Sequence, residues 1–263
     1  MRYSSAYTAS YLRPEASGAS YDLAVENRFE LAIYELERWH LRKLFATYCH
    51  ADPNTRYLDF ACGTGRILSV FRDLIAVRTG VDTSPGQLER ARHKDPAARL
   101  VCGNLVDDPD LLGGARFDLV TCFRLFLNLE SEYRVPILKR IRELLAPGGR
   151  VILDNHMNRY SALGLMAVLA HRGLGIPRKP FVPPGRRGII STMSEREMRR
   201  TLAAAGLEVE LVIRLCVLPG HGSFTLLPER WLVPVERVLG QVPFLNRASK
   251  NQIFVCRAAP SSS

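Results

Sequence analysis

The sequence predicts an α/β protein built around one doubly wound, mostly parallel sheet of seven strands. Short apolar runs alternate with amphipathic segments of helical length, which is typical of βαβ units. The 263 residues are enough to bury a full core, and 47% apolar with 24% charged residues is the balance of a soluble globular protein. Because βαβ crossovers are right-handed, we expect helices on both faces of the sheet.

An N-terminal extension precedes the sheet. Residues 1–20 are rich in Ser, Tyr and Ala without sustained periodicity, and we expect a loose arm or lid there. Residues 22–48 have apolar side chains near one helical face, among them Leu31, Tyr34 and Leu41. We therefore assign residues 1–50 to an N-terminal arm and helix that form a lid.

The core begins with two strand–helix units. Residues 57–60 form an apolar run typical of a buried strand, and after a small-residue loop the apolar positions of 67–74 repeat at helical spacing. Residues 77–82 predict the second strand. Ser84 suits the N-cap of the next helix and Pro85 its first position.

The alternation continues to the end of the chain. A helix is expected between the fourth and fifth strands, ending near Pro147, and Ser194 with Glu197 predicts a capping box for a later helix. The five remaining predicted strands are 98–103, 117–123, 150–155, 207–218 and 251–258.

Two irregular stretches interrupt this pattern. Residues 159–193 are rich in Gly, Pro and Arg, and residues 219–249 are irregular and partly aromatic. We expect both to be insertions that form a substrate cap on a core of residues 51–258. Residues 259–263 read as a polar tail.

The charge of the chain gives a weak indication of its partners. Thirty-six Lys and Arg against 26 Asp and Glu give +10, which favours phosphate-bearing partners or an anionic membrane surface. The basic residues are scattered and lack the interleaved aromatic residues of a single-strand binding surface, so solvated faces explain them better. Nucleic acid is a possible but not a favoured partner, and the oligomeric state cannot be read from the sequence.

Cysteine spacing and the N-terminus indicate the compartment. The six cysteines include no C-x-x-C pair and no His spacing suited to zinc, so we expect reduced thiols and no metal. The N-terminus has no apolar segment of the signal-peptide kind, and the longest apolar stretch, residues 163–170, is too short to span a bilayer. We expect a cytoplasmic protein without a membrane span.

The loop after the first strand, in YLDFACGTGRI at 57–67, indicates a nucleoside ligand. A dinucleotide motif G-x-G-x-x-G would need a third glycine where Leu68 stands, and no G-K-[ST] follows for a triphosphate. Gly63 and Gly65 leave backbone open to a ligand. Asp59 and Asp82 end adjacent strands, and the carboxylate of Asp82 suits the two ribose hydroxyls.

From 57 to 158 the chain resembles the class I S-adenosylmethionine-dependent methyltransferases. LDFACGTGR resembles their first cofactor motif and GVDTSPGQL the second, with CGNLVDDP, FDLVTCF and LLAPGGRVIL following in the same order. The resemblance implies a Rossmann-like fold, S-adenosyl-L-methionine as cofactor and methyltransferase activity. It places residues around the methionine part (Asp59, Ala61, Gly63, Gly65), the ribose (Asp82), the adenine (Asn104, Leu105) and the methionine or acceptor (Phe123, Arg124).

Side chains after the fifth strand are candidates for handling the acceptor. His156 has a suitable intrinsic pKa for a general base, Asn155 lies beside it, and Arg124 suits an anionic acceptor. The alternative is that His156 and Asn155 hydrogen-bond their own turn.

The expected reaction is methylation of a small organic acceptor, with the oxygen of a sugar, lipid-linked or secondary metabolite preferred. An RNA- or protein-directed methyltransferase is the alternative, although the N-P-P-[YF] motif of base amino-group methylation is absent from CFRL, which follows strand four. A non-catalytic cofactor-binding protein and a nicotinamide dehydrogenase also stay open.

Overall fold

A computed structural model describes residues 28–174, 192–218, 220–221, 224–225, 227–243 and 245–260. A seven-stranded sheet with strand order β3-β2-β1-β4-β5-β9-β6 forms the centre of this part of the chain. Its strands are β1 (Tyr57–Phe60), β2 (Arg78–Asp82), β3 (Arg99–Cys102), β4 (Phe117–Cys122), β5 (Leu145–Asn155), β6 (Leu207–Leu215) and β9 (Asn251–Ala258). A separate two-stranded sheet pairs β7 (Gly220–His221) with β8 (Phe224–Thr225).

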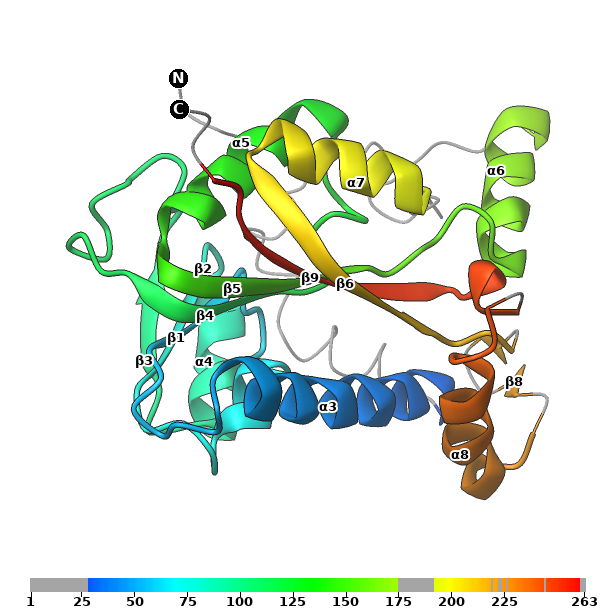
Figure 1. The fold of residues 1–263 in the computed structure, drawn as a ribbon, viewed down its shortest axis with the longest axis horizontal. Helices are drawn as coiled ribbons and strands as arrows, with labels where there is room; N and C mark the ends of the chain where they lie inside the picture. Colours follow the sequence, from blue (N-terminus) through cyan, green and yellow to red (C-terminus); the bar gives the residue numbers. More distant parts are fainter. Residues whose placement is uncertain are drawn as a thin grey trace.

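Helices cover both faces of the large sheet. Figure 1 shows α5 and α7 on one face and α3 along the other. The described helices are α3 (Arg28–Tyr48), α4 (Pro85–Lys94), α5 (Ser131–Glu143), α6 (Ala162–Leu174), α7 (Glu195–Ala204) and α8 (Glu229–Leu239), with 3₁₀ turns η2 (Leu68–Phe71) and η3 (Leu245–Ala248).

The topology confirms the predicted fold class. Strands β3, β2, β1, β4 and β5 pair in parallel, whereas β9 lies antiparallel between β5 and β6. The strand order turns back on itself where β1 meets β4, and in open α/β sheets ligands bind at such a point, beyond the carboxyl ends of the strands.

Two apolar layers hold the sheet between its helices. Successive side chains of a strand point to opposite faces, and helices cover both faces of this sheet. Tyr57 and Leu58, which are neighbours on β1, are therefore both fully buried. Leu58 packs in the layer that contains Leu138 of α5 and Leu202 of α7, and Tyr57 packs in the layer that contains Phe45 of α3. Hydrophobic burial on both faces therefore fixes the position of the β1 end.

The segment after the glycine loop differs from the predicted helix. Only the 3₁₀ turn η2 (Leu68–Phe71) forms there, flanked by turns. Most backbone hydrogen bonds there span three residues, as from the N–H of Val70 to the carbonyl of Ile67 and from the N–H of Arg72 to the carbonyl of Ser69, so no regular α-helical ladder forms. The apolar spacing was read correctly, because Ile67, Val70 and Phe71 are buried.

The N-terminal helix and the second capping box are confirmed. α3 spans Arg28–Tyr48, and residues 1–20, expected to form the arm, lie outside the described residues. Ser194 accepts the N–H of Glu197, and the Glu197 side chain accepts the N–H of Ser194. No described helix is both long enough and apolar enough to cross a membrane.

Candidate functional site

A cavity opens at the carboxyl ends of β1, β2 and β4, where the strand order reverses. It encloses about 1220 Å³ when counted out to its open mouth. Of the residues predicted to bind the cofactor, only Gly65 does not line the cavity, although its neighbours Thr64 and Arg66 do. The others all line it: Asp59, Ala61, Gly63, Asp82, Asn104, Leu105 and Phe123. No described residue of 159–193 or 219–249 lines it, so the cap expected from these insertions stays a prediction.

The glycine loop has a left-handed backbone. Gly63 has φ +54°, Gly65 φ +75° and Ala61, which carries a Cβ, φ +57°. A Cβ on Gly65 would lie 2.9 Å from the Cβ of Ala91 in α4. The backbone angle and the close packing of α4 therefore both require glycine at position 65. Glycine there lets the loop pack closely against α4.

Asp82 ties the loop to the second strand. Its Oδ2 accepts the N–H of Gly63 at 2.8 Å, and its Oδ1 accepts the N–H of Ser84 at 2.9 Å. Burial raises the pKa of this carboxyl, while the two backbone N–H groups oppose the shift. Each carboxylate oxygen has a second lone pair, so the group can still accept hydrogen bonds from two vicinal hydroxyls in the cavity.

Asp59 is more deeply buried at the end of β1. Thr121 of β4 donates a 2.7 Å hydrogen bond to Asp59 Oδ1, and Thr121 also exchanges a 2.7 Å hydrogen bond with the hydroxyl of Tyr57. Burial raises the pKa of Asp59 to about 7. Its other oxygen, Oδ2, is buried without a hydrogen-bond partner in the described chain, so it is the acceptor available to a cationic or N–H group of a ligand.

The third strand contributes an apolar wall and a turn. Leu105 is 2% exposed and presents its side chain to the cavity. The side chain of Asn104 stabilises the turn at 104–107, because its Oδ1 accepts the N–H of Val106 and its Nδ2 donates to Asp107. Asn104 therefore shapes the cavity through its turn, and a direct adenine contact stays a prediction.

Arg124 stands at the end of β4, in the left-handed region with φ +58°. Its backbone N–H donates to Asp154 Oδ1 at 2.7 Å, and its guanidinium Nη2 donates to Glu30 Oε2 of α3 at 2.6 Å. A non-glycine residue in this conformation is uncommon and concentrates at functional sites. The strand end and the N-terminal helix together position the guanidinium at the cavity wall.

The other two catalytic candidates lie outside the cavity lining. Asn155 is buried and donates to the carbonyl of Met193 and to Gln252 Oε1, so it joins β5 to neighbouring segments. His156 is 6% exposed, with Nδ1 3.9 Å from Asp154 Oδ2 and Nε2 4.0 Å from Glu30 Oε2. Burial lowers the pKa of His156 well below its usual value, with Arg124 and Lys250 adding to the shift, so the imidazole is neutral at pH 7.

His156 belongs to a group of buried charged residues under α3, which we call the polar cluster. Lys250 Nζ donates to Glu30 Oε1 at 3.2 Å, and Arg66 pairs with Glu37 at 2.5 Å. The polar cluster consists of Glu30, Glu37, Arg66, Arg124, Asp154, His156 and Lys250. When the imidazole of His156 is neutral and every carboxyl group is ionised, the three negative and three positive charges of the polar cluster cancel.

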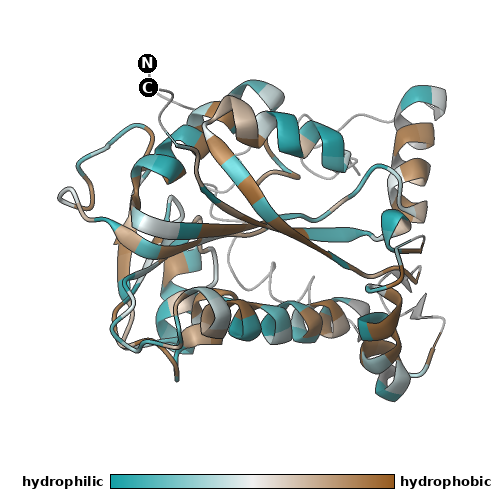
Figure 2. Ribbon diagram, viewed as in Figure 1, coloured by the Kyte–Doolittle hydropathy of each residue, from teal (hydrophilic) through white to brown (hydrophobic). Residues whose placement is uncertain are grey.

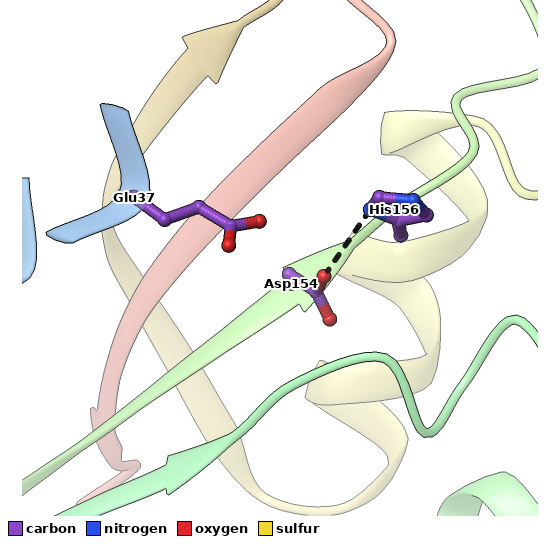
Figure 3. Close-up of side chains that lie close together, drawn as sticks. All are labelled: Glu37, Asp154 and His156. Carbon is purple, nitrogen blue, oxygen red and sulfur yellow. Dashed lines mark ion pairs between the residues drawn. The ribbon is translucent and has the colours of Figure 1, made fainter. Parts of the chain in front are cut away.

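Three members of the polar cluster also have the side chains of a metal site. Figure 3 shows Glu37 extending toward Asp154, and His156 beside Asp154, with one donor atom from each within 4.8 Å of the others. A dication here would add positive charge beside Arg66 and Lys250, which already pair with Glu37 and Glu30. Burial, followed by the nearby Glu37, raises the pKa of Asp154 to about 7, so a proton suits this space better than a dication.

Sequence reasoning missed the residues that support the cavity from other elements. Thr121 lies within the motif FDLVTCF but was not singled out, although its alternation with Leu119 on β4 places it on the sheet face of Tyr57 and Asp59. Glu30 and Lys250 are 220 residues apart, and no local pattern connects them. Gln87 and Tyr133 also line the cavity, from α4 and α5.

Residues 58–151 match the family model described as a methyltransferase domain. Over these residues the chain has the sequence of a methyltransferase domain. The match starts in β1 and ends in β5, so it includes every strand whose carboxyl end borders the cavity. It confirms the family recognised from the motifs.

Named relatives match the methyltransferase domain over part of their length. The demethylmenaquinone methyltransferase of Symbiobacterium thermophilum is 34% identical over 125 residues, 44% of this chain and 47% of that protein. The ubiquinone biosynthesis O-methyltransferase of Thiobacillus denitrificans is 26% identical over 158 residues, 59% of this chain and 65% of that protein. The chain thus spans about half to two thirds of the length of these relatives.

Solved structures share the fold across nearly the whole chain. The complex of DhpI with SAH has a TM-score of 0.60 at 16% identity, covering 97% of this chain and 96% of that one. The magnesium protoporphyrin IX methyltransferase of Synechocystis with bound SAH has a TM-score of 0.57 at 16% identity, covering 88% of this chain and 86% of that one. At this identity the likeness supports the fold of the methyltransferase domain.

Proposed function

We propose that the protein is an S-adenosylmethionine-dependent methyltransferase that acts on a small organic acceptor. The observation that carries this proposal is Asp82, whose two carboxylate oxygens are fixed by the glycine loop and by Ser84 at the rim of the cavity. A carboxylate there can hold both ribose hydroxyls of a nucleoside and would repel a 2′-phosphate. The SAM and SAH complexes among the fold neighbours are consistent with this ligand.

The cofactor, when bound, supplies an activated methyl group on a sulfonium. The protein has to hold the acceptor in line with the sulfur–carbon bond, and positioning of this kind contributes on the order of 7 kcal/mol or more. Asp59, with its free Oδ2, is placed to accept from the amino group of the methionine part. Arg124 is placed to orient an acceptor that carries negative charge.

Calorimetry with S-adenosylhomocysteine and with NAD⁺ tests the cofactor. We expect binding of S-adenosylhomocysteine and none of NAD⁺, because Leu68 replaces the third glycine of a dinucleotide loop. Preference for NAD⁺ would reject the methyltransferase assignment. Binding of S-adenosylhomocysteine without turnover of any acceptor in cell extract would instead favour a non-catalytic protein.

The acceptor is proposed to be a small molecule with a nucleophilic oxygen. Both named relatives have names that refer to quinones, which supports a small-molecule acceptor, and one of them is named an O-methyltransferase, which supports an oxygen. Incubating cell extract with methyl-labelled cofactor, followed by mass spectrometry of organic-soluble and RNA fractions, tests it. Label in the small-molecule fraction is expected, and label confined to RNA or protein would support the alternative.

His156 is proposed to assist the acceptor, either as a base or by positioning Arg124 through Glu30. A buried neutral imidazole can accept a proton, but its place behind the cavity wall favours the positioning role. We expect His156→Ala to lower kcat/KM for the acceptor more than cofactor affinity. A base would leave a change in the pH profile of kcat, whereas a positioning residue would mainly raise KM for the acceptor. Full activity in the variant would remove both roles.

A further inference from the structure

A second concavity lies away from the cofactor cavity, and arginines dominate its walls. It encloses about 1270 Å³ out to its open mouth and shares no lining residue with the cofactor cavity. α7, β6 and η3 contribute its charged residues, which are Arg196, Arg199, Arg200, Arg214, Arg247 and Glu195. We call this concavity the arginine groove.

The arginine groove has positive charge that the described chain does not neutralise. Glu195 pairs with Arg214 at 2.7 Å and with Arg199 at 3.0 Å, so both of its carboxylate oxygens already accept hydrogen bonds from arginines. Arg196, Arg200 and Arg247 have no acidic partner among the described residues. Five arginines against one glutamate leave an excess of four positive charges in one concave surface.

An apolar helix face stands beside the arginine groove. Leu165, Met166 and Leu169 of α6 are 48%, 63% and 69% exposed. Leu165 and Leu169 are one helical turn apart, with Arg172 following on the same side of the helix. Tyr160, which is 62% exposed and lines the groove, precedes α6 by two residues and connects the two surfaces.

Further apolar side chains are exposed on α8 and η3, at the same end of the sheet. Trp231 and Val238 of α8 are 55% and 63% exposed, and Leu245 of η3 is 38% exposed two residues before Arg247. Figure 1 shows α6 and α8 at the same end of the sheet, and Figure 2 shows brown, apolar residues on both helices. This end of the molecule thus presents a basic groove together with exposed apolar side chains on two helices.

We propose that this end docks on the surface of a bilayer that contains anionic phospholipid. The lipid phosphates occupy the arginine groove, where guanidinium groups bind phosphate through paired hydrogen bonds. Leu165, Met166 and Leu169 enter the boundary between headgroups and acyl chains. The 13 residues of α6 are too few to span a bilayer but suit a helix that lies in the interface.

Charge complementarity and the flanking apolar residues favour a lipid surface over a free phosphate. A soluble phosphate ester needs the arginine groove alone and leaves exposed apolar side chains on both sides of it unexplained. Single-stranded nucleic acid would stack its bases on aromatic platforms, and the groove is lined by one aromatic residue, Tyr160.

Co-sedimentation of the full chain with vesicles tests the proposal. We expect binding to phosphatidylcholine vesicles that contain phosphatidylglycerol, weak binding to pure phosphatidylcholine, and loss of binding as salt is raised. Arg196→Gln/Arg200→Gln/Arg247→Gln should weaken binding on the order of a hundredfold, because each arginine near an anionic surface contributes about 1 kcal/mol. Met166→Ser/Leu169→Ser should weaken binding at high and low salt alike.

The matched control removes three exposed arginines elsewhere, on α4, β3 and the segment before β4, as Arg92→Gln/Arg99→Gln/Arg116→Gln. It changes net charge equally and should keep most of the binding. Equal loss in the control would show that net charge alone matters, which contradicts a docking end. Failure to bind phosphatidylglycerol vesicles at low salt also overturns the proposal. It is overturned as well if pyrophosphate or RNA stabilises the protein while vesicles do not bind. Melting temperature and S-adenosylhomocysteine affinity check that each variant is folded.

Discussion

Beside the cofactor cavity, the carboxyl ends of β1 and β2 are built differently from those of β4 and β5. At the ends of β1 and β2, Asp59 and Asp82 are held by neighbouring backbone and by one threonine, so most of that site comes from a continuous stretch of chain. At the ends of β4 and β5, Arg124 and Asp154 are held by the polar cluster, which takes residues from α3 and from the start of β9. The first arrangement presents a carboxylate to a ligand, whereas the second pairs its charges within the chain and keeps Arg124 at the cavity wall. The comparison suggests that cofactor binding depends on the first end and fold stability on the second.

Glu37→Gln should have the largest effect, and the effect should be on stability. The Glu37 side chain is fully buried and pairs with Arg66, so removing its charge leaves a buried guanidinium without its partner. We expect a loss of about 3–5 kcal/mol in the free energy of unfolding, measured with denaturant. Glu35→Gln, on the same helix but in an exposed pair with Arg38, should cost no more than about 1 kcal/mol. Similar costs for the two variants would contradict a stabilising polar cluster.

Asp82→Ala should have the largest effect on cofactor binding. Loss of two charge-assisted hydrogen bonds to a ribose is expected to weaken S-adenosylhomocysteine binding by about 3 kcal/mol, roughly a hundredfold, by calorimetry. Asp110→Ala, an exposed carboxylate outside the cavity, is the control and should bind normally. Unchanged affinity in Asp82→Ala, with circular dichroism showing a folded chain, would show that the nucleoside binds elsewhere.

Gly65→Ala tests whether the glycine loop requires a residue without a side chain at position 65. Its φ of +75° and the 2.9 Å approach to Ala91 predict a loss of about 2–3 kcal/mol in the free energy of unfolding. Gly86→Ala, in the first turn of α4, has no atom within 4 Å of its added Cβ and should be neutral or slightly stabilising. Thermal melting of both variants checks this, and equal melting temperatures would contradict it.

Asp154→Asn should give the smallest effect, visible as a change in pH dependence. The folded pKa of Asp154 is about 7, above its ordinary value of 3.8, so its contribution to stability is fully present below about pH 4 and is lost as pH rises toward 7. Asparagine does not titrate and can still accept the N–H of Arg124. Relative to the native chain, the variant should gain about 1–2 kcal/mol between pH 5 and 7. Glu37, Arg124 and His156 are present in both proteins, so the difference in melting temperature isolates residue 154, and parallel pH curves would reject the raised pKa.

Much of the fold and of the cofactor site could be predicted because it depends on local patterns. Apolar runs and capping signals placed the seven strands and α3, and the motifs from Asp59 to Phe123 identified the cavity wall. The α-helix expected after the glycine loop is wrong, because most backbone hydrogen bonds of that segment span three residues and give only the 3₁₀ turn η2. The placement of Asn155 and His156 outside the cavity lining could not be predicted, since it depends on Met193, Gln252 and Glu30.

The sequence alone determined the order of the elements, the family and the carboxylates that end the first two strands. Periodicity and turn chemistry act within a few residues, so they can be read along the chain. The tertiary structure decided which charges are neutralised and which stay available. Arg124, Lys250 and Glu30 meet only after the sheet has closed under α3, and the arginine groove gathers residues from α7, β6 and η3. Coulombic and desolvation energies depend on distance and burial in three dimensions, and neither is encoded by neighbouring positions in the sequence.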